Sequence, residues 1–335
     1  RFGSDSAEVA ELDSVRLSAL RVDGQIDAAH QLALDLRERE RHLFGDTAEQ
    51  TLDTTATLVR SYADQGKLAD SRALAETVLS QAAHDGADAA TMASLQSELA
   101  QTYSKLGLID AAQQSMSAAI AANAAQYGED DVRTLEARAE LGSILFVAKH
   151  YTDALQHYRA LVPQYVRIFG PEHSKTLTMR GNVAAALMTT EPSQAADMLA
   201  ELLSVRRRVL GDMHPDTVTT LGNQAASLWW AKRYAEAAPA FHQYVALCDQ
   251  IRPPNHPSCA ERRKGEGKSL RELGRYPEAE VALLDAYARK SKAEGAQFDG
   301  PAEVARELAE LYRRWDKPEQ MREWLQKAGD PVPPR

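Results

Sequence analysis

The chain has 335 residues and a formal net charge of −9, and its hydrophobic fraction of 44% is enough for a folded core. The acidic balance argues against nucleic-acid binding. No run of 18 apolar residues occurs, so we expect no membrane insertion within the chain. Alanine, leucine and glutamate are abundant while valine and isoleucine are sparse, which favours helices over strands.

A short turn signal recurs along the whole chain. It is clearest at Gly66-Lys67-Leu68 and at Lys232-Arg233-Tyr234. Successive copies are separated by 41 or 42 residues. A period of this length is typical of stacked helical repeats. The eight copies begin at Gly24, Gly66, Gly107, Lys149, Glu191, Lys232, Gly274 and Asp316.

Each turn signal lies between two segments with helical apolar spacing. Small residues recur seven positions before the turn, for example Ala100, Gly142 and Ala184, and would let two helices approach closely. We therefore predict an all-α, right-handed α-solenoid of about eight helix pairs, forming one superhelical domain over 1–329. The units are expected near 5–45, 46–86, 87–128, 129–170, 171–211, 212–252, 253–295 and 299–329, with a tail over 330–335.

One unit carries the clearest family likeness. It runs from Leu210-Gly211-Asp212-Met213-His214-Pro215-Asp216-Thr217 through Asn223-Gln224-Ala225 to Lys232-Arg233-Tyr234-Ala235-Glu236-Ala237. This pattern resembles the long tetratricopeptide repeat of kinesin light chains, which is near 42 residues in length. The resemblance covers nearly the whole chain and implies a scaffold that binds a protein or an extended peptide.

The last unit, Leu311 to Gln320, resembles the final unit of repeat regions attached to bacterial membrane serine/threonine kinases. That likeness implies a periplasmic sensory or docking domain in signal transduction. The sequence begins with Arg1 rather than Met, so we expect a piece of a longer chain. The alternative is a cytoplasmic adaptor or peptide-responsive regulator with no kinase attached. A homodimer is an option that the sequence leaves open.

Motifs for catalysis, cofactors and metals give no positive prediction. Gly265-Glu266-Gly267-Lys268-Ser269 resembles part of a phosphate-binding loop, but Arg262 occupies the position of the required first glycine. We interpret these glycines as small packing residues. His173, His214 and His256 recur one repeat apart, too far to share a metal ion, and are expected at helix starts. The sequence shows no kinase motif and no converging acid–base set, so we predict that the chain is not an enzyme and that any kinase domain lies outside it. We also predict no cofactor and no metal.

Cys248 and Cys259 fall on either side of the loop 252–257. A reversal of the chain there could bring their α-carbons within the roughly 7 Å that a disulfide requires. In an oxidising compartment the two residues could form this bond. In a cytosol they would be two buried small residues.

The first helix of each pair is expected to line a concave groove. Polar residues on one stripe of these helices lie four or seven positions apart, which places them on one face. Asn182 and Asn223 match the asparagines that hydrogen-bond peptide backbones in related repeats, and Trp230 would add an apolar anchor. The alternative is a merely solvated face. The predicted groove residues are Glu98, Glu136, Glu140, Thr178, Asn182, Thr219, Asn223, Ser227 and Trp230.

Overall fold

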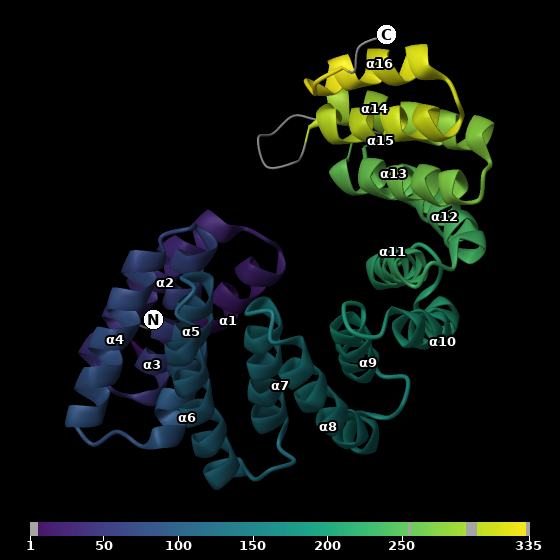
Figure 1. The fold of residues 1–335 in the computed structure, drawn as a ribbon. Coiled ribbons are helices and arrows are strands. Elements are labelled where there is room, and N and C mark those ends of the chain that lie inside the picture. Colours follow the sequence, from purple (N-terminus) through teal and green to yellow (C-terminus); the bar gives the residue numbers. More distant parts are fainter. Residues whose placement is uncertain (1–5, 254–255, 293–299, 333–335) are drawn as a thin grey trace. The chain divides into compact units, whose positions relative to one another are not determined.

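The computed structural model describes residues 6–253, 256–292 and 300–332. Sixteen helices and no strand are found in these ranges, so the all-α prediction is confirmed. The helices fall into two compact units, 1–168 and 169–335. Figure 1 shows the first unit in purple to teal. Its helices are α1 (Ala7–Val22), α2 (Ile26–Phe44), α3 (Glu49–Asp64), α4 (Leu68–His84), α5 (Ala89–Lys105), α6 (Ile109–Tyr127), α7 (Val132–Val147) and α8 (Tyr151–Phe169).

The second unit repeats the same pairing. Each of the eight helix-pair repeats expected from the sequence encloses one pair of helices. Pro254, Asn255, 293–299 and the end of the tail lie outside the described residues. A single domain over 1–329 stays a prediction. The helices are α9 (Ser174–Leu187), α10 (Pro192–Leu210), α11 (Pro215–Trp230), α12 (Tyr234–Ile251), α13 (Pro257–Glu272), α14 (Tyr276–Lys292), α15 (Pro301–Arg314) and α16 (Pro318–Ala328).

Seven of the eight turns have a left-handed backbone at their first residue, and the exception is Glu191 with φ −136°. Gly107 has φ +76° there, a conformation that glycine adopts without steric cost. Lys232 and Lys149 occupy the same place with φ +60° and +64°, so these copies tolerate some strain. The positive φ explains why glycine recurs at this position of the turn signal.

Small residues let the helices of a pair approach closely. A β-carbon added to Gly142 of α7 would lie 2.6 Å from the ring of Tyr158 in α8. Within each unit, first helices also contact one another, as α3 does α5 and α13 does α15. No comparable contact joins the second helices in the described part of the chain. The first helices therefore lie on the more tightly packed side of these stacks.

The recurring histidines begin helices. His173, His214 and His256 are the N-cap residues of α9, α11 and α13, and each accepts a hydrogen bond from the backbone N–H two residues later. Their prediction as helix-start residues is confirmed. The prediction for the glycines is confirmed as well, because added β-carbons at Gly265 and Gly267 would lie within 2.7 Å of neighbouring side chains.

Candidate partner-binding surface

The three glutamates predicted in the first unit come together. Glu98 of α5 and Glu136 and Glu140 of α7 line one cavity of about 310 Å³. Glu98 is only 5% exposed and forms an ion pair with Arg60 of α3. Burial raises the pKa of Glu140, and the charge of Glu98 raises it further. Glu98 is therefore tied to a neighbouring helix, whereas Glu136 is exposed.

The polar residues predicted in the second unit lie on two first helices. Thr178 and Asn182 belong to α9, Thr219 and Asn223 to α11, and both helices pack against α10. The threonines are exposed and the asparagines are half-buried. Neither asparagine amide forms a hydrogen bond to another described residue. These two amides are free to bond a partner in the same register of successive repeats.

Trp230 fits the predicted surface, but Ser227 does not. The Trp230 side chain is 62% exposed and meets the ring of Trp229 edge-on at 4.9 Å. Trp229 is half-buried, with Lys268 Nζ 4.4 Å from its ring centroid. Ser227 is fully buried, and its hydroxyl donates to the carbonyl of Asn223 at 2.8 Å. Its prediction as a groove residue is therefore wrong.

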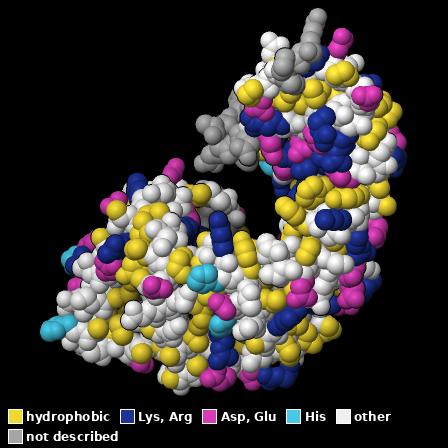
Figure 2. Space-filling view, in the orientation of Figure 1, with side chains coloured by type: hydrophobic (Ala, Val, Ile, Leu, Met, Phe, Trp, Pro, Cys, Tyr) yellow, Lys and Arg dark blue, Asp and Glu magenta, His cyan; other side chains and the backbone are white. Residues whose placement is uncertain are grey.

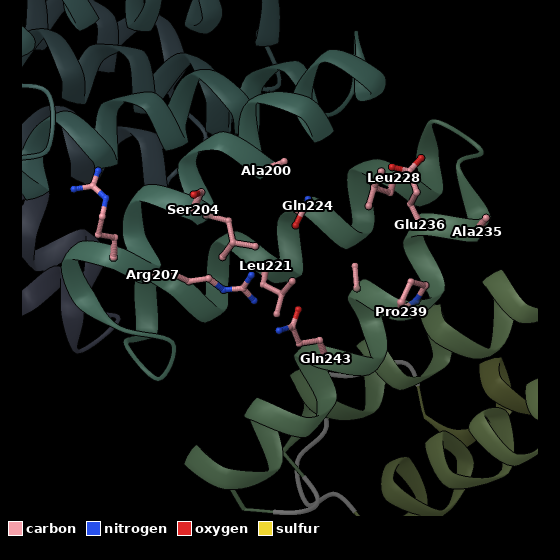
Figure 3. Close-up of a pocket in the computed structure, with 13 residues that line it drawn as sticks. Ala200, Ser204, Arg207, Leu221, Gln224, Leu228, Ala235, Glu236, Pro239 and Gln243 are labelled. Carbon is pink, nitrogen blue, oxygen red and sulfur yellow. The ribbon is translucent and has the colours of Figure 1, made fainter.

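The second compact unit also contains a cavity that was not predicted from the sequence. It measures about 800 Å³ and is lined by the second helices α10 and α12 and by α11; Figure 3 shows its lining residues. Gln224 and Gln243 provide amides there, and Leu221 forms part of the apolar wall. Small residues on the second helices, such as Ala200 and Ala240, leave this space open and were a usable signal.

Three consecutive arginines, 206–208, lie near the end of α10, and two of them form the following contacts within the chain. Arg206 is 7% exposed and donates to the carbonyl of Asp216 at 3.1 Å and to the hydroxyl of Thr220 at 2.7 Å. Arg208 donates to both carboxylate oxygens of Glu172, at 2.8 and 2.5 Å. Arg206 therefore connects two successive repeats, whereas the contact of Arg208 lies within one repeat.

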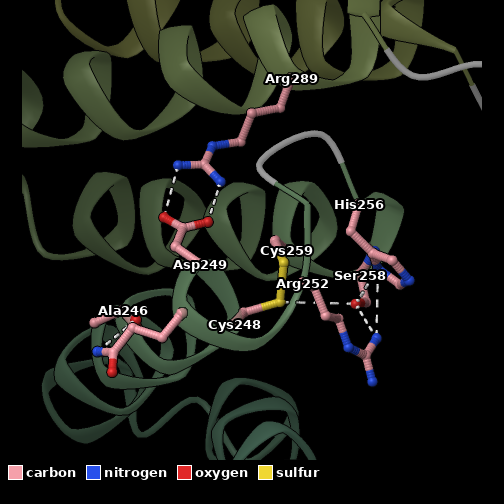
Figure 4. Close-up of a disulfide and its surroundings, with 9 residues drawn as sticks. Ala246, Cys248, Asp249, Arg252, His256, Ser258, Cys259 and Arg289 are labelled. Carbon is pink, nitrogen blue, oxygen red and sulfur yellow. Dashed lines mark hydrogen bonds and ion pairs between the residues drawn. A yellow bond between two sulfur atoms is a disulfide. The ribbon is translucent and has the colours of Figure 1, made fainter.

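Cys248 and Cys259 are joined in a disulfide between α12 and α13, with α-carbons 5.8 Å apart (Figure 4). Both cysteines are fully buried. Close by, the Arg289 guanidinium donates to both carboxylate oxygens of Asp249. The chain reversal thus delivers the geometry that the sequence allowed. Oxidation in the native compartment stays a prediction.

Charged side chains gather over α13 and α15, where Figure 2 shows basic and acidic groups interleaved. Lys264 Nζ lies 2.7 Å from Glu261 and 2.6 Å from Glu303. Lys290 Nζ lies 3.0 and 3.2 Å from the same two carboxylates. Both lysine side chains are less than 10% exposed. In the described ranges, no group of His, Cys, Asp and Glu could hold a metal ion, and no helix is long and apolar enough to cross a membrane.

Comparison with protein-family models identifies the type of repeat. Two models described as tetratricopeptide repeat match residues 176–216 and 216–292. Residues 176–292 are tetratricopeptide repeats. No curated protein sequence matches the chain. Together with the fold, these matches confirm the predicted repeat type.

Solved structures share the tetratricopeptide fold over most of the chain. A kinesin light chain with TPR-like repeats from P. anserina is 19% identical, with a TM-score of 0.53, over 60% of this chain and 96% of its own. The quorum sensor NprR from B. thuringiensis is 12% identical, with a TM-score of 0.63, over 96% and 86%. A signal transduction ATPase with a tetratricopeptide repeat sensor from Pyrococcus horikoshii is 13% identical, with a TM-score of 0.71, over 97% and 47%.

Proposed function

We propose that this chain is a non-catalytic scaffold that binds a protein or an extended peptide through its first helices. The observation that carries the proposal is the pair of free amides, Asn182 and Asn223, at one register of successive repeats. A side-chain amide offers a donor and an acceptor together, which suits a peptide group. The exposed Trp230 provides an adjoining apolar contact. Two proteins of the same fold are described as a quorum sensor and as carrying a repeat sensor, which supports a sensing role.

The groove is tested by removing the two amides. Peptides are first selected from a random library for binding to the wild-type chain. Their affinity for the double variant Asn182→Ala plus Asn223→Ala should be at least about tenfold lower, since two hydrogen bonds are lost. Gln224→Ala plus Gln243→Ala is the matched control, because it removes two amides from the cavity between α10 and α12. Loss of affinity in the glutamine variant alone would place the partner in that cavity and overturn the proposal.

We further propose that the scaffold is the periplasmic sensory or docking domain of a bacterial transmembrane serine/threonine kinase. The likeness of the last unit supports this context, and a disulfide between Cys248 and Cys259 suits an oxidising compartment. The expected result is no thiol titratable in denaturant, when the protein is taken from its native compartment without reductant. Two titratable thiols would instead support the cytoplasmic adaptor.

A further inference from the structure

A cavity in the first unit is rich in carboxyl groups. It measures about 680 Å³ and lies between α1, α2 and α3, which are adjacent in Figure 1. Its charged lining comprises four acidic residues and one arginine: Glu8, Glu11, Glu40, Asp53 and Arg21. The surplus of acidic groups gives the cavity a negative potential at neutral pH.

Glu40 is the buried member of this group. It is 3% exposed, and its Oε2 atom has no hydrogen-bond partner in the described part of the chain. Burial raises the pKa of Glu40 to about 7; the hydroxyl of Thr54 opposes this shift, Asp53 adds to it and Arg39 opposes it. Arg39 itself is paired with Asp13 at 2.5 Å. A buried carboxyl oxygen without a donor is costly, so a ligand that supplies one would be favoured.

The seventh helix pair shows what fills the same place elsewhere in the chain. Counted from the turn signals, three positions of the first pair and one position of α3 correspond to three positions of the seventh pair and one position of α15. Glu11 corresponds to Glu261, Ser14 to Lys264, Glu40 to Lys290 and Asp53 to Glu303. In the seventh pair the two ammonium groups bind both glutamates at 2.6 to 3.2 Å. The equivalent set in α1, α2 and α3 keeps the two acidic residues, but it has a serine and a third carboxyl in place of the two lysines.

We propose that the cavity between α1, α2 and α3 binds a primary alkylammonium group, which takes the place of the missing lysines. An ammonium group carries three N–H donors and has no acceptor, so it suits a set of carboxylates. A partner's lysine side chain and a free polyamine share this chemistry. The inference goes beyond the proposed groove, since it concerns a different surface in the other compact unit and does not depend on Asn182 or Asn223.

The test is a titration of the whole chain with Nα-acetyl-lysine amide. The readout is the NMR chemical shifts of the backbone amides in α1, α2 and α3. Saturable shifts are expected with this probe and not with Nα-acetyl-norleucine amide, which has the apolar chain without the ammonium group. Equal responses to both probes, or no response, would overturn the proposal. Spermidine in a parallel titration separates the sources. Tighter binding than the lysine probe assigns a polyamine, and weaker binding assigns a lysine side chain.

Matched variants locate the site. Glu40→Gln should weaken binding of the lysine probe by about tenfold or more, because a charge-assisted hydrogen bond is lost. Glu38→Gln removes the same charge two residues away, outside the cavity lining, and should leave binding unchanged. Glu40→Lys introduces a lysine at the position of Lys290 and should abolish binding. Wild-type affinity in the Glu40→Gln variant would contradict the inference.

The pH dependence of the wild-type chain gives a second measurement that needs no variant. The ammonium group favours the ionised form of Glu40, so affinity should fall as the pH drops through about 7. Glu8, Glu11, Asp53 and Arg21 face the same cavity, and the affinity that remains at lower pH is assigned to the three carboxylates, since Arg21 repels a cation. An affinity that stays constant between pH 8 and pH 6 would contradict the role of Glu40.

Discussion

The first and the seventh helix pairs, each taken with the helix that follows it, have four equivalent positions that are filled by different side chains. In the seventh pair, Lys264 and Lys290 are nearly buried and neutralise Glu261 and Glu303. In the first pair, a carboxyl group lies at the position of Lys290, and one of its oxygen atoms is unpaired. The repeat register thus fixes where a side chain lies and how deeply it is buried. The residue type then decides whether that side chain finds an oppositely charged or hydrogen-bonding partner within the protein.

Removing a lysine from the seventh pair should have the largest effect on stability. Burial alone would lower the pKa of Lys264, but the contacts with Glu261 and Glu303 raise it overall. Lys264→Met keeps the aliphatic stem and deletes the charge. We expect a loss of about 2–4 kcal/mol in the free energy of unfolding, because two partly buried carboxylates lose a partner.

Urea unfolding followed by tryptophan fluorescence measures this loss in the second unit, where all four tryptophans lie. Lys292→Met is the matched control, since this lysine is exposed at the end of α14, and it should change the free energy of unfolding by less than about 0.5 kcal/mol. Equal effects of the two substitutions would show that the buried ion cluster contributes nothing particular to stability.

The period and the turns could be predicted from the sequence because they depend on local backbone chemistry. A glycine at φ +76° or a histidine that caps a helix acts through residues close to it in the chain, as Gly107 and His214 do. The positions of the groove asparagines also followed, since register alone places them on successive first helices.

The acidic cavity could not be predicted because it depends on contacts between repeats. Glu40 has the pattern of a solvated glutamate near the end of a helix, yet packing buries it. Ser227 was misassigned for a related reason. Its register position holds Ile144, Ala186 and Leu311 in other units, and all of these are buried. The repeat pattern therefore indicates burial at Ser227, whereas the cavity beside Glu40 depends on which residues of α1 and α3 face it.

A smaller effect on stability is expected in the first pair, where it depends on the pH. The pKa of Glu40 is about 7 in the folded protein and about 4.5 in its ordinary state, so the folded chain holds this proton more tightly. Stability is therefore full below pH 4.5 and falls as the pH rises through 7. Glu40→Gln removes that loss, and we expect a gain of about 1–3 kcal/mol at pH 8 and little change at pH 4.5.

Native-state hydrogen exchange of the α1, α2 and α3 amides, corrected for intrinsic rates, measures this gain locally. Glu38→Gln should give the same small change at both pH values, because its side chain is 57% exposed. The seventh pair should respond in the opposite direction. Burial would raise the pKa of Glu303, but its contacts with Lys264 and Lys290 lower it overall, so its contribution is lost as the pH falls below about 4.5. A gain for Glu40→Gln that is as large at pH 4.5 as at pH 8 would show that the unpaired carboxyl is not the source of the difference between the two pairs.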